Sequence, residues 1–274
     1  MARMHLNPKQ IINIVALLAL GGALLSACSV REIRRQNSIA AADAATPAAT
    51  MDYLVYLPKD YDAVQQDSTE WPVLFFLHGI VQSGNDLRML PKYGPAQQIE
   101  AGRDFPFIVI TPQMSAWSWD VDATVAFIEH CIETYAIDPN RVYLSGVSLG
   151  GRGVWSVGAA RPDLFAAIAP VAGWGKQEEA EATAQIPAWI FHGEKDPLIW
   201  PSAAEKMHAA REAAGGNAEL TLVPGAGHTI WDEVFAGDLL YEWMLAQSRD
   251  AAPGDTDGYH GRRDQPEAST AARP

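Results

Sequence analysis

The chain has 274 residues, of which 48% are hydrophobic and 19% are charged, as in an ordinary globular protein. Its formal net charge of −13 argues against nucleic acid as a partner. The two cysteines, Cys28 and Cys131, are too few for a disulfide-rich scaffold or a cysteine-based zinc site.

Residues 1–27 are typical of a secretory signal peptide. Arg3 and Lys9 precede an apolar run over residues 11–25, which two glycines interrupt and which is short for a membrane-spanning helix. The following Leu-Ser-Ala-Cys, which ends at Cys28, resembles the lipobox of bacterial lipoproteins. This resemblance predicts cleavage before Cys28 and a lipid on its thiol. A plain signal peptide and an uncleaved anchor are the alternatives.

The lipobox implies an exported protein that contacts the membrane of the bacterial cell envelope only through its lipid anchor. Ser29 at the next position favours the outer membrane in a source with two membranes, by analogy with enterobacterial sorting. Lipidation of Cys28 leaves Cys131 without a disulfide partner. Cys131 lies in a helical pattern beside Ile128 and Ile132, so we expect a buried structural thiol.

Composition divides the rest of the chain into three parts. Residues 28–50 comprise Cys28 and a segment rich in Ala, Ser, Thr and charge, which predicts a flexible tether. Residues 248–274 contain no Val, Ile, Leu, Met, Phe or Trp, so we expect a disordered tail. The folded domain is therefore predicted over residues 51–247.

Within that domain, continuous apolar runs alternate with helical periodicity. Strands are predicted at residues 53–57, 73–77, 107–110, 141–144, 167–172, 188–191 and 218–223, and helices at 121–135, 203–214 and 239–244. Continuous apolar runs suit strands that are buried on both faces. The alternation therefore predicts an α/β fold with a mostly parallel, doubly wound sheet flanked by helices. Segment 82–104 is too short for a large lid domain.

The motif Gly146-Val-Ser148-Leu-Gly150 follows a predicted strand and precedes a helix that we expect to begin near Leu149. This context is typical of a nucleophile elbow, a strained turn that exposes the serine hydroxyl above the sheet. The alternative is a glycine-rich helix start with Ser148 as N-cap. The backbone amides of Leu149 and of Ile80, which follows His-Gly at a strand end, are the candidate oxyanion donors.

A serine nucleophile needs a base and an acid that orients the base. His228 follows the last predicted strand, and Asp196 follows the strand at 188–191, so both are expected at the same edge of the sheet as Ser148. Glu194 and Asp232 are alternative acids. The other histidines considered are His208 in a predicted helix, His78 and His192 at strand ends, and His130 on a helix face.

These motifs make residues 51–247 similar to the α/β-hydrolase superfamily. The narrower resemblance is to bacterial carboxylesterases and peptidases of the dienelactone-hydrolase, feruloyl-esterase and prolyl-oligopeptidase-like groups. It is carried by Tyr-Leu-Pro at 56–58, His-Gly at 78–79, Asp-Pro-Asn-Arg-Val-Tyr at 138–143, the elbow with Trp155, His192-Gly193 to Asp196, and Gly227-His228 with Trp231. The resemblance implies catalytic roles for Ser148, Asp196 and His228.

Five tryptophans fall on loops at the predicted active-site edge and are candidates for the substrate pocket: Trp117, Trp119, Trp174, Trp200 and Trp231. Aromatic walls suit an aryl or sugar-linked ester, and packing beneath loops is the alternative. We expect hydrolysis of small carboxylic esters through an acyl-enzyme on Ser148. A serine peptidase with the same triad and a non-catalytic surface-binding lipoprotein are the alternatives. The sequence has no His-Glu-x-x-His motif, so neither a metal nor a cofactor is expected.

Overall fold

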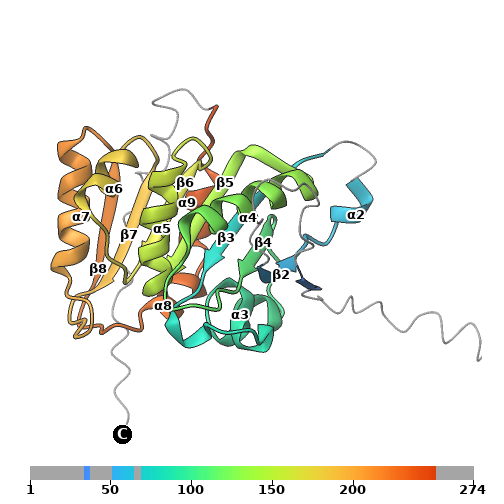
Figure 1. Cartoon of the computed structure of the whole chain (residues 1–274), viewed down its shortest axis with the longest axis horizontal. Helices are drawn as coiled ribbons and strands as arrows, with labels where there is room; N and C mark the ends of the chain where they lie inside the picture. The colour runs from blue at the N-terminus through green and yellow to red at the C-terminus, as the bar shows by residue number, and fades with distance from the viewer. Residues whose placement is uncertain (1–33, 38–50, 65–68, 251–274) are drawn as a thin grey trace, which may run out of the picture. The chain divides into compact units, whose positions relative to one another are not determined.

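The computed structural model describes residues 34–37, 51–64 and 69–250. The predicted signal peptide, Cys28 and residues 251–274 lie outside these ranges. The described residues form one eight-stranded sheet in the order β1-β2-β4-β3-β5-β6-β7-β8 (Figure 1). In chain order the strands are β1 Arg34–Asn37, β2 Asp52–Tyr56, β3 Trp71–Leu77, β4 Ile108–Pro112, β5 Ile137–Val147, β6 Ala167–Val171, β7 Ala188–Gly193 and β8 Ala218–Val223. None of the helices in the described ranges is long and apolar enough to cross a membrane.

The sheet is mostly parallel, as predicted. Strands β4, β3, β5, β6, β7 and β8 run parallel to one another, whereas β2 pairs antiparallel with both β1 and β4. Because the carboxyl ends of parallel strands meet at one edge, the loops that follow β3, β5, β7 and β8 lie at the same edge. Those four loops carry Ile80, Ser148, Asp196 and His228.

Strand β3 illustrates why the apolar runs form central strands. Successive side chains of a strand point to opposite faces of the sheet. Val73, Phe75 and Leu77 pack into the core on one face, and Leu74 and Phe76 pack into the core on the other, all of them fully buried. A strand that is covered on both faces needs apolar residues at consecutive positions, which explains the continuous run.

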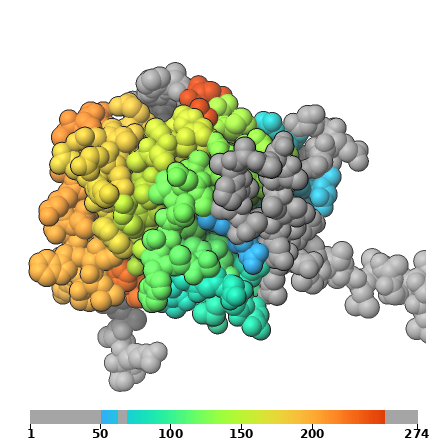
Figure 2. Space-filling model, in the orientation of Figure 1, coloured from blue at the N-terminus to red at the C-terminus, as the bar shows by residue number. Residues whose placement is uncertain are grey.

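The helices form a layer on each face of the sheet. One layer contains α4 Val121–Thr134, α5 Leu149–Ala160, α6 Gln177–Ala182 and α7 Ser202–Ala213, and the free Cys131 of α4 is buried in it as expected. The helices of this layer cover the sheet in the space-filling view (Figure 2). The other layer contains α3 Pro95–Glu100, α8 Trp231–Ala236 and α9 Leu239–Leu245. The short helices α2 Tyr61–Val64, η3 Ile80–Gln82 and η4 Leu87–Lys92 lie in connecting segments.

The structure corrects two boundaries that the sequence suggested and adds a helix. Residues 34–37, inside the predicted tether, form β1 and pair with β2. An edge strand can be held by backbone pairing alone, so its sequence needs no apolar pattern. The predicted helix at 239–244 is confirmed as α9, but the residues before it form a further helix, α8, which carries Asp232 and ends before Gly237. Residues 248–250 are attached to the domain, since the Arg249 amide donates to the Asn140 carbonyl at 3.0 Å.

A buried arginine organises the connection between α6 and β7. Arg211 of α7 is fully buried. Its guanidinium donates to backbone carbonyls of Thr183 at 2.5 Å, Ala184 at 3.3 Å and Asn217 at 3.1 Å, and also to the carbonyl of Ile186. Burial lowers the pKa of Arg211 to about 10, which still leaves it charged at neutral pH. One side chain therefore satisfies several carbonyls that have left regular secondary structure.

Arg211→Met is expected to reduce the free energy of unfolding by about 2–4 kcal/mol, because it leaves buried carbonyls without donors. Urea denaturation followed by circular dichroism measures the change. Arg88→Met is the matched control, because the Arg88 side chain is 76% exposed, and its transition midpoint should not move. Equal midpoints for the two variants would contradict the role assigned to Arg211.

Candidate active site

Ser148 stands on a strained turn between β5 and α5. Its backbone has φ 54° and ψ −114°, a conformation that residues other than glycine rarely adopt. The Ser148 amide donates to the Val171 carbonyl at 2.8 Å, and the Ser148 carbonyl accepts from the Arg152 amide at 3.0 Å. Helix α5 begins at Leu149, as predicted. The turn therefore has the strand, strained serine and helix of a nucleophile elbow.

Two glycines allow the elbow to form. A Cβ atom on Gly150 would lie 1.8 Å from the Leu77 carbonyl oxygen, and one on Gly146 would lie 2.7 Å from the same oxygen. No larger residue fits at either position unless β3 and α5 move apart. The glycines of the motif are therefore required by the close approach of the end of β3.

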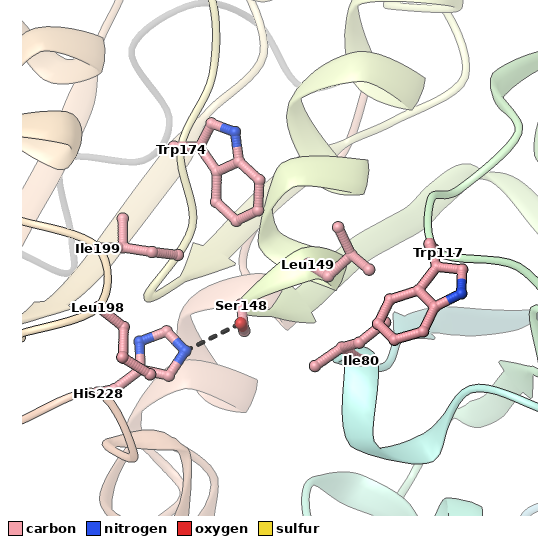
Figure 3. Close-up of a pocket in the computed structure, with 8 residues that line it drawn as sticks. All are labelled: Ile80, Trp117, Ser148, Leu149, Trp174, Leu198, Ile199 and His228. Atoms are coloured by element: carbon pink, nitrogen blue, oxygen red, sulfur yellow. Dashed lines mark hydrogen bonds between the residues drawn. The ribbon is translucent and has the colours of Figure 1, made fainter.

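The structure brings the three predicted catalytic side chains into one hydrogen-bonded chain. His228 Nε2 lies 2.9 Å from Ser148 Oγ (Figure 3), and His228 Nδ1 lies 2.7 Å from Asp196 Oδ2. Asp196 follows β7 and His228 follows β8, so adjacent parallel strands supply the candidate acid and the candidate base. This geometry allows the imidazole to take the hydroxyl proton while the carboxylate fixes its orientation.

Asp196 is held as an ionised carboxylate. Its side chain has no exposed surface, and its Oδ1 accepts from the amides of Leu198 at 2.8 Å and Ile199 at 3.0 Å. Burial by itself raises the pKa of this carboxyl, but the hydrogen bonds from His228 and from the Ile199 and Leu198 amides outweigh burial and hold the pKa below its ordinary value. The alternative acid Glu194 instead accepts from the Gly225 amide at 2.7 Å.

The other histidines are engaged elsewhere. His130 contacts Thr134 of its own helix, and His208 Nε2 lies 3.0 Å from the Ala218 carbonyl. His192 Nε2 lies 2.8 Å from the Ile199 carbonyl and 3.2 Å from Asp196 Oδ2. The contact between His192 and Asp196 was not predicted, because sequence spacing does not reveal that the loop after β7 turns back over its own strand.

The loop with the predicted oxyanion donor Ile80 is fixed by its neighbours. His78 Nε2 accepts from the Met114 amide at 3.1 Å, so His78 Nδ1 carries the proton that it donates to the Gly79 carbonyl at 2.7 Å. Burial lowers the pKa of His78 to about 4, so this histidine stays neutral. The Gly79 amide donates to the Tyr93 hydroxyl at 3.0 Å, and the Trp119 indole donates to the His78 carbonyl at 3.2 Å.

Ile80 and Leu149 are the first residues of η3 and α5. Amides in the first turn of a helix have no acceptor within that helix, so both are available to a ligand. A Cβ atom on Gly79 would lie 3.5 Å from the Ser148 Cβ, which shows how close this loop is to the nucleophile. The placement fits the predicted oxyanion donors, whose role stays a prediction.

A cavity of about 520 Å³ opens beside Ser148 and is lined by Ile80, Trp117, Ser148, Leu149, Trp174, Leu198, Ile199 and His228 (Figure 3). Leu198 and Ile199 lie on the His228 side of Ser148, and Ile80 and Trp117 lie on the opposite side. Apart from Ser148 and His228, every lining side chain is aliphatic or aromatic. The cavity therefore suits an uncharged, largely apolar ligand.

Only two of the five tryptophans predicted for the pocket line it, namely Trp117 and Trp174. Trp119 is buried beside His78, with ring centroids 5.0 Å apart, and supports the oxyanion loop instead. Trp200 is 72% exposed outside the cavity lining. Trp231 packs edge-on against His228, with ring centroids 5.6 Å apart, and so supports the base. The sequence places these residues on the correct edge of the sheet but does not fix the direction of each side chain.

The cavity also contains apolar residues whose side chains the sequence did not single out. Leu198 and Ile199 donate their backbone amides to Asp196 and present their side chains to the cavity. Ile80 and Leu149 were predicted only as backbone donors, and their side chains line the cavity as well. Their position in the sequence could have identified them, since each of these residues is, or lies within three positions of, a predicted site residue.

The family model of the dienelactone hydrolase family matches residues 94–234, about half of the chain. The chain belongs to this family. The matched segment contains Ser148, Asp196 and His228. The structure of a thermostable esterase is 25% identical and superposes with a TM-score of 0.65 over 80% of this chain and 64% of that chain. Together with the parallel sheet and the elbow, this likeness confirms the α/β-hydrolase fold.

Two curated relatives match this chain over shorter segments. NocK of Nocardia uniformis subsp. tsuyamanensis, which is described as an esterase, is 37% identical over 81 residues. The match covers 29% of this chain and 24% of that protein. The bifunctional acetylxylan esterase/xylanase of Neocallimastix patriciarum is 27% identical over 136 residues, which is 47% of this chain and 20% of that protein. The chain therefore matches about a quarter or less of the length of these relatives.

Asp196→Asn is expected to lower kcat for ester hydrolysis by about 10⁴-fold in this member of the dienelactone hydrolase family, because the amide does not hold the required tautomer of His228. Hydrolysis of p-nitrophenyl acetate measures the loss. Asp232→Asn is the matched control, since Asp232 was the alternative acid and is exposed on α8. A larger loss in the control than in Asp196→Asn would contradict the assignment of the acid.

Proposed function

We propose that this protein is a serine carboxylesterase that hydrolyses small, uncharged carboxylic esters through an acyl-enzyme on Ser148. The observation that carries the proposal is the continuous chain from Ser148 Oγ through His228 to Asp196. A hydrogen-bonded nucleophile, base and orienting acid, placed at the mouth of a cavity, is the arrangement that acyl transfer requires.

The reaction follows from this geometry in two halves. His228 Nε2 removes the proton from Ser148 Oγ as the oxygen attacks the ester carbonyl, and the amides of Ile80 and Leu149 stabilise the resulting oxyanion. His228 then returns the proton to the leaving alcohol, which leaves the acyl group on Ser148. In the second half, water gives a proton to His228 and attacks the acyl-enzyme. The acid is released, and the proton returns to Ser148.

The cavity indicates the substrate chemistry. Since the leaving oxygen receives its proton from His228, the alcohol part of the ester faces the side of the cavity formed by Leu198 and Ile199. Trp117 and Trp174 offer flat apolar surfaces to an aryl group or to the face of a sugar. The description of one relative as an acetylxylan esterase fits a sugar-linked ester. A substrate with a charged group in the cavity is disfavoured, because no lining side chain pairs with it.

Ser148→Ala is expected to lower ester hydrolysis by about 10⁴-fold or more, because the acyl-enzyme has no attachment point. The substrates are p-nitrophenyl acetate, methyl ferulate, acetylated xylan and aminoacyl p-nitroanilides. Ser156→Ala is the matched control, since Ser156 lies on the same helix and donates only to backbone carbonyls of its preceding turn. Faster cleavage of anilides than of esters would favour a serine peptidase. Ester hydrolysis at wild-type rate by Ser148→Ala would contradict the mechanism, and the absence of any hydrolysis would favour a binding protein.

We further propose that the protein is lipidated on Cys28 and tethered to the bacterial cell envelope, with the outer membrane as the expected site in a source with two membranes. The proposal is supported by the Leu-Ser-Ala-Cys motif at the end of an apolar run, which lies outside the described residues. Cys28→Ser is expected to abolish incorporation of radiolabelled palmitate and to release the protein from the membrane fraction. Cys131→Ala is the control that should retain the label, because Cys131 is buried in the fold.

A further inference from the structure

We propose that His192 is a positioning residue of the active site: its imidazole Nε2–H donates to the Ile199 carbonyl and so fixes the loop that holds the acid Asp196 and forms one wall of the cavity. The inference rests on the proposed esterase function. It goes beyond the three residues of the triad, because His192 touches neither Ser148 nor the space that the ester occupies.

The contacts of His192 set it apart from the other histidines. Its side chain has no exposed surface, and its Nε2 lies 3.2 Å from Asp196 Oδ2 and 2.8 Å from the Ile199 carbonyl. Asp196 Oδ2 is also the oxygen that His228 Nδ1 approaches at 2.7 Å. Among the described residues, His192 and His228 are the two side chains that contact this carboxylate. His228 is hydrogen-bonded to this oxygen, whereas His192 lies beside it and is hydrogen-bonded to the Ile199 carbonyl.

The surroundings assign the tautomer of His192. Nε2 faces a carbonyl and a carboxylate, both of which only accept, so Nε2 carries the proton. Nδ1 is buried and has no hydrogen-bond partner in the described part of the chain. His192 is thus a fixed donor rather than a second base.

This donor acts on the reaction through the loop that follows β7. The bond to the Ile199 carbonyl holds the loop whose amides bind Asp196 Oδ1 and whose side chains line the cavity. His192 thus orients the acid through this loop.

Three variants separate this role from a general packing role. His192→Leu removes the donor, whereas the amide nitrogen of His192→Gln reaches the position of the imidazole Nε2 and restores it. His208→Leu is the matched control, because it also removes an imidazole that contacts a backbone carbonyl, that of Ala218, at a site away from Asp196. The readouts are kcat and KM for p-nitrophenyl acetate, and the His192 tautomer by ¹⁵N NMR of the full-length chain in detergent.

The proposal expects His192 to carry its proton on Nε2. It expects His192→Leu to lose about 10-fold or more in kcat/KM through misplacement of the base. The loss should appear in kcat, because a displaced Asp196 no longer orients His228. His192→Gln should recover most of the wild-type kcat. His208→Leu should keep the wild-type kcat.

A His192→Leu variant with the wild-type kcat would overturn the proposal, as would a proton on His192 Nδ1. Failure of His192→Gln to restore kcat would also overturn it. Absence of ester hydrolysis by the wild-type protein would instead overturn the proposed function. The NMR readout decides the inference in that case, because it needs no substrate.

Discussion

The close approach of the end of β3 to the start of α5 is the constraint on which the active site depends. The Leu77 carbonyl occupies the space that a Cβ atom on residue 150 would need. This contact forces the chain through a positive φ at Ser148 and raises the hydroxyl above the sheet. It also places the loop that begins at His78 directly beside the nucleophile. One packing contact thus positions both the nucleophile and the predicted oxyanion donors.

A second close approach brings together the other two candidate catalytic residues. A Cβ atom on Gly193 would lie 1.9 Å from the Gly227 carbonyl, so the loops after β7 and β8 touch at their bases. Asp196 and His228 project from these two loops and meet at 2.7 Å. The surrounding amides hold the carboxylate in place before any substrate binds. Such preorganisation spares the site a rearrangement during the reaction.

The apolar cavity complements this polar set. The same loop that delivers Asp196 also delivers Leu198 and Ile199, and the same helix start that offers the Leu149 amide offers the Leu149 side chain. Backbone atoms therefore serve the chemistry, while side chains of the same residues shape the binding space. These residues therefore form an open cavity of about 520 Å³ beside Ser148 without a large lid.

The sequence by itself determined the parallel sheet, the elbow and the candidate acid and base, because apolar runs, glycine spacing and chain order are local signals. It did not determine β1, whose pairing uses backbone groups that every sequence has. Only the tertiary structure decided that Trp119 and Trp231 support other residues while Trp117 and Trp174 face the cavity. The contact of His192 with Asp196 was decided there too. The direction of a loop side chain depends on packing between distant segments, and no local pattern encodes it.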